Sequence, residues 1–253
     1  MSVSASNLLT YCDELLGSAR FSDYCPNGLQ VEGKPEIQRL ATAVTANQRV
    51  IDEAVSWGAD ALLVHHGYFW RGEDQRVIGL KRRRLGALLA AEVNLLAYHL
   101  PLDAHPELGN NAQWAARLGV TEVEPLDPAD PQAVGNLGRL DAPMSLGDLC
   151  DLIERITQRS PLLVGDRHTP VRRLAWCTGA AQGYIDKAAS RGAEVYISGE
   201  ISEPTYHVAR ESGIAYIAAG HHATERYGVQ ALGQALAAKF ELEYCFIDSD
   251  NPV

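Results

Sequence analysis

Residues 40–66 constrain the fold most, because they have the pattern of a strand, an amphipathic helix and a second strand joined by short links. Residues 40–45 and 61–64 are short apolar runs, which are typical of buried strands. Residues 48–57 carry apolar side chains at helical spacing, and Gly58 is suited to end that helix. Such a strand–helix–strand unit joins parallel strands, so the chain is predicted to be an α/β protein.

The rest of the chain continues this alternation. Further helices are predicted at 4–17, 81–92, 145–158, 185–191, 204–212 and 224–240, with one more ending near Leu118. Further strands are predicted at 93–98, 161–164, 171–177, 195–197, 214–219 and 241–248. Residues 21–33 are expected to form a loop, and composition favours an ordinary surface loop over the wall of a pocket. Residues 121–141 are rich in Pro, Asp and Gly, which indicates a boundary or a variable connection.

Two stretches of the sequence resemble each other. Residues 51–60 (IDEAVSWGAD) and 185–194 (IDKAASRGAE) are identical at six of ten positions, and the tenth pairs Asp with Glu. A shorter echo relates 96–103 to 218–225, each with an apolar strand, a histidine and a carboxylate four residues later, although this match could be a coincidence. Together the two echoes suggest similar α/β halves, without proving a duplication.

Bulk composition narrows the function classes. The chain has 253 residues, a net charge of −10 and a pI near 5.2, which disfavours attraction to nucleic acid or an anionic membrane. We expect no membrane span and no signal peptide. The five scattered cysteines include no C-x-x-C pair, so mostly buried thiols in a reducing cytoplasm are expected.

Histidines and carboxylates gather where three predicted strands end. They are His65 and His66, then His99 and Asp103, then His221, His222 and Glu225. Open α/β sheets bind ligands at the carboxyl ends of their strands, and imidazole with carboxylate suits zinc, iron, manganese or nickel. A lone histidine is more often structural, but two His-His pairs at strand ends favour a metal site.

The adjacent pair His65 and His66 raises a difficulty, because neighbouring side chains on a strand point to opposite faces. The two histidines can serve one site only if the strand ends or bends between them, or if they bind two metal ions. Acid–base catalysis by His and Asp without a metal stays open. A Ser-His-Asp hydrolase is weaker, because no G-x-S-x-G motif is present, and no Walker A or G-x-G-x-x-G motif follows a strand.

Two surface features have a plain and a functional interpretation. The aromatic run Tyr68, Phe69 and Trp70 could stack on a flat base or simply cover the core. The basic run 81–84 is more often a solvated helix face than an anion site or a subunit contact.

Four segments resemble the GTP cyclohydrolase I type 2 homologues, the YbgI-like proteins of the wider NIF-three-like group. They are 23–33 (DYCPNGLQVEG), 64–70 (VHHGYFW), 99–112 (HLPLDAHPELGNNA) and 219–226 (AGHHATER). The resemblance implies two interlinked, internally similar α/β domains and a toroidal homohexamer. The expected metal-site domain is 1–125 plus 221–253, and the expected second domain is 126–220.

The same resemblance implies a dinuclear metal centre. Its ligands would be His65, His66, Asp103, His221 and Glu225, binding two divalent ions of zinc, iron, manganese, nickel or magnesium. His99 and His222 would be nearby supporting or catalytic groups. The implied function is hydrolysis of a nucleotide such as GTP, with opening of the purine ring, or of damaged nucleotides, with DNA damage as the related process. A non-enzymatic metal-binding scaffold or adaptor ring is the alternative.

Overall fold

A computed structural model describes the whole chain, Met1–Val253, which divides into two compact units. The first unit comprises Met1–Gly109 and Gly228–Asp250, and the second comprises Asn110–Tyr227 and Asn251–Val253. The chain leaves the first unit and later returns to it, so the two units are interlinked. Their limits differ from the expected domains, because residues 110–125, 221–227 and 251–253 belong to the second unit.

The first unit is built on a five-stranded sheet in the order β13-β4-β5-β6-β2. Its strands are β2 (Gly28–Val31), β4 (Arg39–Thr45), β5 (Ala61–His66), β6 (Asn94–Ala97) and β13 (Glu243–Phe246). Strands β13, β4, β5 and β6 are parallel, which confirms the predicted parallel pair, and β2 is antiparallel to β6. A short pair, β1 (Val3–Ser4) with β3 (Glu36–Ile37), lies outside this sheet.

Strand β2 was not expected, since it lies in the segment interpreted as a surface loop. That interpretation is wrong for β2, which forms one edge of the sheet. Only the first and last of its four residues are buried, and it begins with Gly28, so it lacks the apolar run that marks the central strands.

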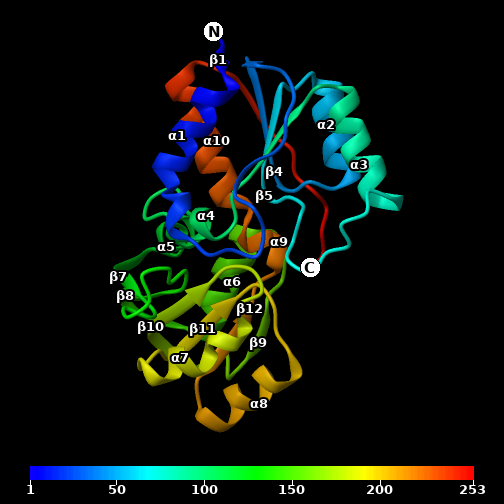
Figure 1. Ribbon diagram of the computed structural model, residues 1–253. Helices are drawn as coiled ribbons and strands as arrows, with labels where there is room; N and C mark the ends of the chain where they lie inside the picture. Colours follow the sequence, from blue (N-terminus) through cyan, green and yellow to red (C-terminus); the bar gives the residue numbers. More distant parts are fainter. The chain divides into compact units, whose positions relative to one another are not determined.

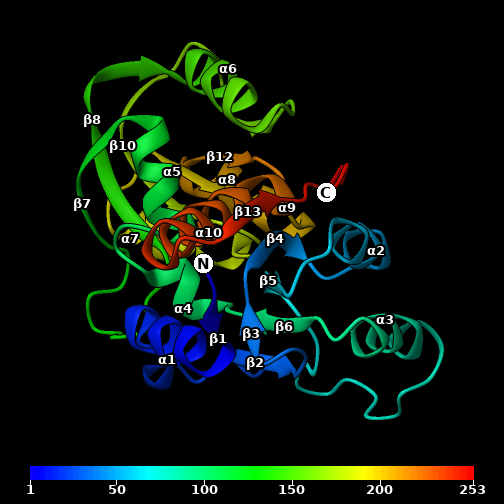
Figure 2. The ribbon, with the colours of Figure 1, turned by 90° about the horizontal axis from the view of Figure 1, so that it is seen from above.

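Helices cover both faces of this sheet (Figures 1 and 2). One face carries α2 (Gln48–Trp57) and α3 (Gly79–Ala90), which bury Val50, Ile51 and Leu88 against it. The other face carries α1 (Ala5–Leu16) and the part of α10 (Arg226–Phe240) that includes Leu232 and Leu236. The 3-10 turn η1 (Ser18–Arg20) follows α1, and the short helix α4 (Leu100–Ala104) follows β6.

The second unit is built on a six-stranded sheet in the order β7-β8-β10-β11-β12-β9. Its strands are β7 (Val120–Pro125), β8 (Asn136–Ser145), β9 (Leu162–Val164), β10 (Pro170–Cys177), β11 (Val195–Ser198) and β12 (Ala215–Ala218). Strands β10, β11 and β12 are parallel, and the other pairings are antiparallel. Of the boundary or variable connection expected at 121–141, only 126–135 is a connection, because β7 and β8 pair on either side of it.

Helices also cover both faces of the second sheet. The helices α5 (Asn110–Leu118) and α6 (Leu146–Thr157) bury Trp114, Leu149 and Ile153 on one face. The helices α7 (Ile185–Ser190), preceded by η2 (Gln182–Tyr184), and α8 (Glu203–Ser212) bury Ile185, Ala188 and Ala209 on the other. The helix predicted at 224–240 is α10, which begins two residues later, and the short helix α9 (His221–Thr224) precedes it, with Glu225 between them.

The two units share one order of elements. The first has β4-α2-β5-α3-β6 and the second has β10-α7-β11-α8-β12. The matching decapeptides occupy equivalent places, each running along the first of these helices and ending at the residue before the next strand. Gly58 and Gly192 both have left-handed φ angles, of +81° and +75°, where each helix ends. The internal similarity expected from the longer echo is therefore confirmed.

The shorter echo is out of register by one residue. The backbone N–H of Tyr98 donates to Val64, and that of Ala219 donates to Ser198 in the same way. Equivalent strand pairs, Val64 with Ala97 and Ser198 with Ala218, give the same alignment. By this register His99 corresponds to Gly220 and not to His221, so the shorter echo is a coincidence of spacing. No helix in the structure has the length and apolar character needed to cross a membrane.

Candidate metal centre

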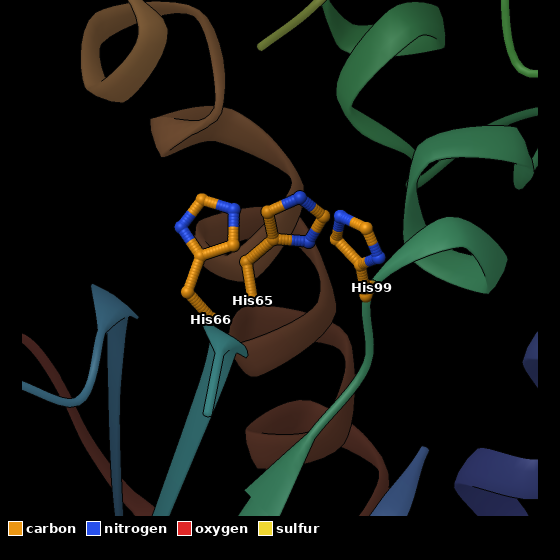
Figure 3. A group of neighbouring side chains, drawn as sticks. All are labelled: His65, His66 and His99. Atoms are coloured by element: carbon orange, nitrogen blue, oxygen red, sulfur yellow. The ribbon is translucent and has the colours of Figure 1, made fainter. Parts of the chain in front are cut away.

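Strand β5 ends in two neighbouring histidines. His65 is fully buried, with its Nδ1 2.9 Å from the carbonyl oxygen of Tyr98. His66 is half-buried, with its Nδ1 3.1 Å from the hydroxyl of Thr45. The strand ends at His66, and the two ring centroids lie 4.6 Å apart, so the rings lie side by side (Figure 3). Because the strand ends here, the two neighbouring histidine side chains do not point to opposite faces of the sheet.

His99, which follows β6, adds a third imidazole to this pair (Figure 3). Its ring centroid is 5.0 Å from that of His65 and 5.8 Å from that of His66. One ring nitrogen from each of the three histidines lies within 4.8 Å of the other two. We call His65, His66 and His99 the three-histidine cluster.

Hydrogen bonds fix how two of these rings are protonated. A carbonyl oxygen only accepts, so Nδ1 of His65 carries the proton that it donates to Tyr98. His99 donates from Nδ1 to Oδ1 of Asp23 at 2.7 Å. Burial raises the pKa of Asp23, but hydrogen bonds from His99 and Asn27 outweigh this and lower it to about 2. In the neutral rings Nε2 then carries the lone pair, and metal-binding histidines are commonly held in this way.

Asp103 lies within α4, next to the three-histidine cluster. It is buried, and its Oδ1 is 3.5 Å from Nε2 of His65. This distance is too long for a good hydrogen bond, but both atoms could bind one ion at bond lengths of about 2.0–2.2 Å. Within the first unit, the structure thus brings together the expected ligands His65, His66 and Asp103.

The second unit holds the other expected ligands, His221 and Glu225. Nδ1 of His221 is 2.7 Å from Oε1 of Glu200, and its Nε2 is 3.2 Å from Oε2 of Glu225. Burial lowers the pKa of His221, but hydrogen bonds and negative charge from Glu225 and Glu200 outweigh this and raise it to about 9. Glu225 is only 3% exposed, and a carboxylate so deeply buried requires a cation or donors beside it.

Two glycines make room for this His–Glu pair. Gly179 has a φ of +70°, and a Cβ there would lie 2.1 Å from Oε1 of Glu225. A Cβ on Gly199 would lie 2.7 Å from Cα of His221. Any side chain at either position would therefore displace the pair.

His222 follows His221 on α9 and is buried. Its backbone N–H donates to the carbonyl oxygen of Val253 at 3.0 Å. Adjacent residues on a helix do not share a face, so its side chain leaves α9 in a different direction from that of His221. The expected catalytic role of His222 stays a prediction.

Comparisons with known proteins identify the family of this chain. Residues 3–252 match the model of the family described as Duf34/NIF3 (NGG1p interacting factor 3). The chain belongs to this family. A Duf34/NIF3 relative from Pseudomonas aeruginosa, named GTP cyclohydrolase 1 type 2 homolog, is 54% identical over 252 residues, which cover 100% of each chain.

Solved structures share this Duf34/NIF3 fold over almost the whole chain. That of the protein ybgI, described as of unknown function, has a TM-score of 0.93 at 49% identity and covers 99% of this chain and 100% of its own. That of TTHA1606 from Thermus thermophilus has a TM-score of 0.88 at 34% identity, with the same coverage of 99% and 100%. The resemblance expected from the four motifs is thereby confirmed.

Sequence reasoning missed the residues that orient the histidines of this Duf34/NIF3 chain. They are Asp23, Thr45 and Glu200. Asp23 opens one of the four motifs, which was a signal that the segment is more than a surface loop. Glu200 closes the second copy of the repeat at the position that His66 holds in the first, which was a second signal.

Proposed function

We propose that this protein is a metal-dependent hydrolase that acts on a nucleotide. The observation that carries the proposal is the three-histidine cluster, in which hydrogen bonds orient the rings and Asp103 lies alongside. The donor set fits divalent metal, because imidazole nitrogen and carboxylate oxygen are the usual ligands of zinc, iron, manganese and nickel. Magnesium, which prefers oxygen, is a poorer match for so many nitrogens.

In this proposal two divalent ions are bound per chain. The ligands are the residues that the family resemblance implies: His65, His66, Asp103, His221 and Glu225. Glu225 would contribute its buried carboxylate to this set, since carboxylate oxygens are usual ligands of divalent metals. The ions, when bound, supply the Lewis acidity that activates water near neutral pH and polarises the bond under attack.

Residues around the proposed ligands handle protons. Asp23 holds the Nδ1 of His99, so the Nε2 of that ring is the atom that takes up or releases a proton. His222 is proposed as a second such group. For GTP, whose name appears in the description of the Pseudomonas relative, attack would fall on the imidazole ring of guanine, and damaged nucleotides are a further substrate class.

Two properties of the whole chain belong to the same proposal. We propose a toroidal homohexamer, on the family resemblance. We also propose a reducing, cytoplasmic setting, because none of the five cysteines forms a disulfide.

A screen of the metal-loaded protein against nucleotides and phosphoesters tests the reaction. We expect at least one nucleotide to be hydrolysed, with kcat lowered about 100-fold or more in His99→Ala, the usual scale for loss of a proton-transfer group. The matched control is His168→Ala, an exposed histidine that should leave the rate unchanged. Absence of turnover across the panel, with two ions bound per chain, would contradict the hydrolase and favour the scaffold or adaptor.

A further inference from the structure

We propose that the loop after β5, together with the start of α3, forms a nucleotide-binding site beside the three-histidine cluster. The base would stack on Phe69, and the phosphates would contact Arg71 and Lys81. This inference rests on the proposed function and deepens it, since it names an anionic, aromatic ligand from contacts in the first unit alone.

The three aromatic residues of the loop have different surroundings. Tyr68 is buried, and its hydroxyl donates to the carbonyl oxygen of Ala46. Trp70 is half-buried, its Nε1 donates to the carbonyl oxygen of Gly67 at 3.2 Å, and its ring centroid is 5.1 Å from that of His99. Phe69 is 38% exposed. Phe69 is therefore the ring that can stack on a ligand, while Tyr68 and Trp70 support the loop.

Phe69 is held in a costly backbone conformation. Its φ is +65°, which a bulky residue rarely adopts. A tight turn follows it, in which the N–H of Trp70 donates to Oε2 of Glu73 and the N–H of Glu73 donates back to the carbonyl oxygen of Trp70. Strain of this kind persists where the surroundings enforce it, and it is common at ligand-binding loops.

A cavity of about 390 Å³ lies against the loop. Its lining comes from residues of the segment 69–75 and from Lys81. This volume is within the range of small-molecule sites, about 300–1,000 Å³. Trp70 lines the cavity and also contacts the ring of His99, so a ligand in the cavity would lie next to the three-histidine cluster.

The charge of the cavity wall is positive, although the whole chain is acidic. Lys81 lies 5.1 Å over the ring of Phe69 and 3.2 Å from Oε1 of Glu73. Arg71 adds a second cation, so two positive groups stand against one carboxylate. A guanidinium suits phosphate because it can donate two parallel hydrogen bonds.

Arg71 also ties the cavity to the residues that orient His99. Its backbone N–H donates to the carbonyl oxygen of Tyr24 at 2.7 Å, and its guanidinium donates to that of Asp23 at 3.0 Å. Its guanidinium carbon lies 5.9 Å over the exposed ring of Tyr24. The same segment therefore positions both the proposed phosphate contact and the histidine next to it.

Calorimetric binding of three probes to the metal-free full chain tests this site. The probes are guanosine, inorganic triphosphate and GTP, which separate the aromatic part of the ligand from the anionic part. We expect GTP to bind more tightly than either fragment. Phe69→Asn should weaken guanosine and GTP about tenfold and leave triphosphate unchanged, since stacking on one ring contributes on this scale. Asn tolerates the left-handed conformation, so the loop should persist.

Arg71→Gln should do the reverse, weakening triphosphate and GTP about tenfold while guanosine is unaffected. The matched control is Arg83→Gln, an exposed arginine of α3 that does not line the cavity. Unchanged GTP affinity in both Phe69→Asn and Arg71→Gln overturns the site. Binding through the cavity without turnover in the metal-loaded protein keeps this site and defeats the hydrolase. Turnover with an unaltered KM in both variants would keep the hydrolase and rule out this binding site.

Discussion

Asp23 is the residue on which the orientation of His99 depends. Its carboxylate accepts hydrogen bonds from the side chains of His99 and Asn27 and from the backbone N–H groups of Tyr24 and Leu100. Only 2% of its side chain is exposed. Four donors around one buried carboxylate leave His99 a single orientation, so Asp23 acts as a positioning residue.

The substitution Asp23→Asn should lower kcat about tenfold to 100-fold, the usual cost of losing a group that orients an active histidine, with KM nearly unchanged. The amide keeps the size of the side chain, but one of the two accepting oxygens is replaced by an NH2 group, which donates. The ¹⁵N chemical shifts of His99 should show that its proton no longer stays on Nδ1. The exposed substitution Asp52→Asn on α2 serves as control. Unchanged ¹⁵N shifts in Asp23→Asn would show that the carboxylate does not set the tautomer.

The candidate ligand residues could be predicted from the sequence, whereas the groups that hydrogen-bond to them could not. His65 and His66 follow an apolar strand directly, so their place at a strand end is visible in the sequence. The contact of His65 with the backbone of Tyr98 leaves no such pattern, because any residue type has a carbonyl oxygen. Asp23 reaches His99 from a distant segment, and no spacing in the sequence records that hydrogen bond.

Among the secondary-structure elements, the last position of the sequence repeat has the same structural role in both units. Asp60 accepts hydrogen bonds from the backbone N–H groups of Gln38 and Arg39, at the start of β4. Glu194 accepts those of Arg172 and Arg173 in β10 in the same way. In both units this carboxylate joins the strand before the helix to the strand after it.

The contribution of Asp60 to stability should depend on pH. Burial raises its pKa, but hydrogen bonds from Lys34, Gln38 and Arg39 outweigh this and lower it. A carboxylate with a lowered pKa in the folded state stabilises the fold above its unfolded pKa, and this is lost as pH falls through the folded pKa. Asp60→Asn should therefore cost about 1–3 kcal/mol of unfolding free energy at pH 7. The difference from the unmodified protein should shrink below about pH 4.

Urea unfolding of both proteins at pH 7 and pH 3 measures this difference. A gap that stays constant or widens towards acid would show that the charge of Asp60 is not what stabilises the strand junction.

Most of the predictable strands are central, and the edge strands β9 and β13 are the exceptions. The strands β4, β5 and β6 are buried because helices cover both faces of their sheet, and their apolar composition reflects this burial. The strands β2, β7 and β8 lie at or near sheet edges and keep polar, exposed residues. These strands form because they pair with neighbouring strands, and their composition alone indicated loops or connections.

In the whole molecule, helices α5 and α10 each pack in a different unit from the element that precedes them in the chain. Helix α5 follows the β6–α4 segment of the first unit but packs its Trp114 into the core of the second. Helix α10 follows β12 of the second unit but packs Leu232 and Leu236 into the core of the first. An amphipathic pattern shows that a helix has a buried face without showing which sheet buries it. The unit limits were therefore not predictable from the sequence.

The proposed metal ligands lie in segments far apart in the sequence. His65, His66 and Asp103 belong to the first unit, and His221 and Glu225 belong to the second. The central claim is that this set binds two divalent ions per chain.

Metal analysis by mass spectrometry, combined with size-exclusion chromatography and light scattering for the particle mass, tests whether the ions are bound. The proposal predicts two divalent ions per chain in a homohexamer. Glu225→Gln should lose at least one of them, because a neutral amide is a poorer ligand for a divalent ion than a carboxylate. Glu211→Gln, an exposed carboxylate on α8, should keep both. Two ions per chain retained in Glu225→Gln, or none bound by the unmodified protein, would contradict the account.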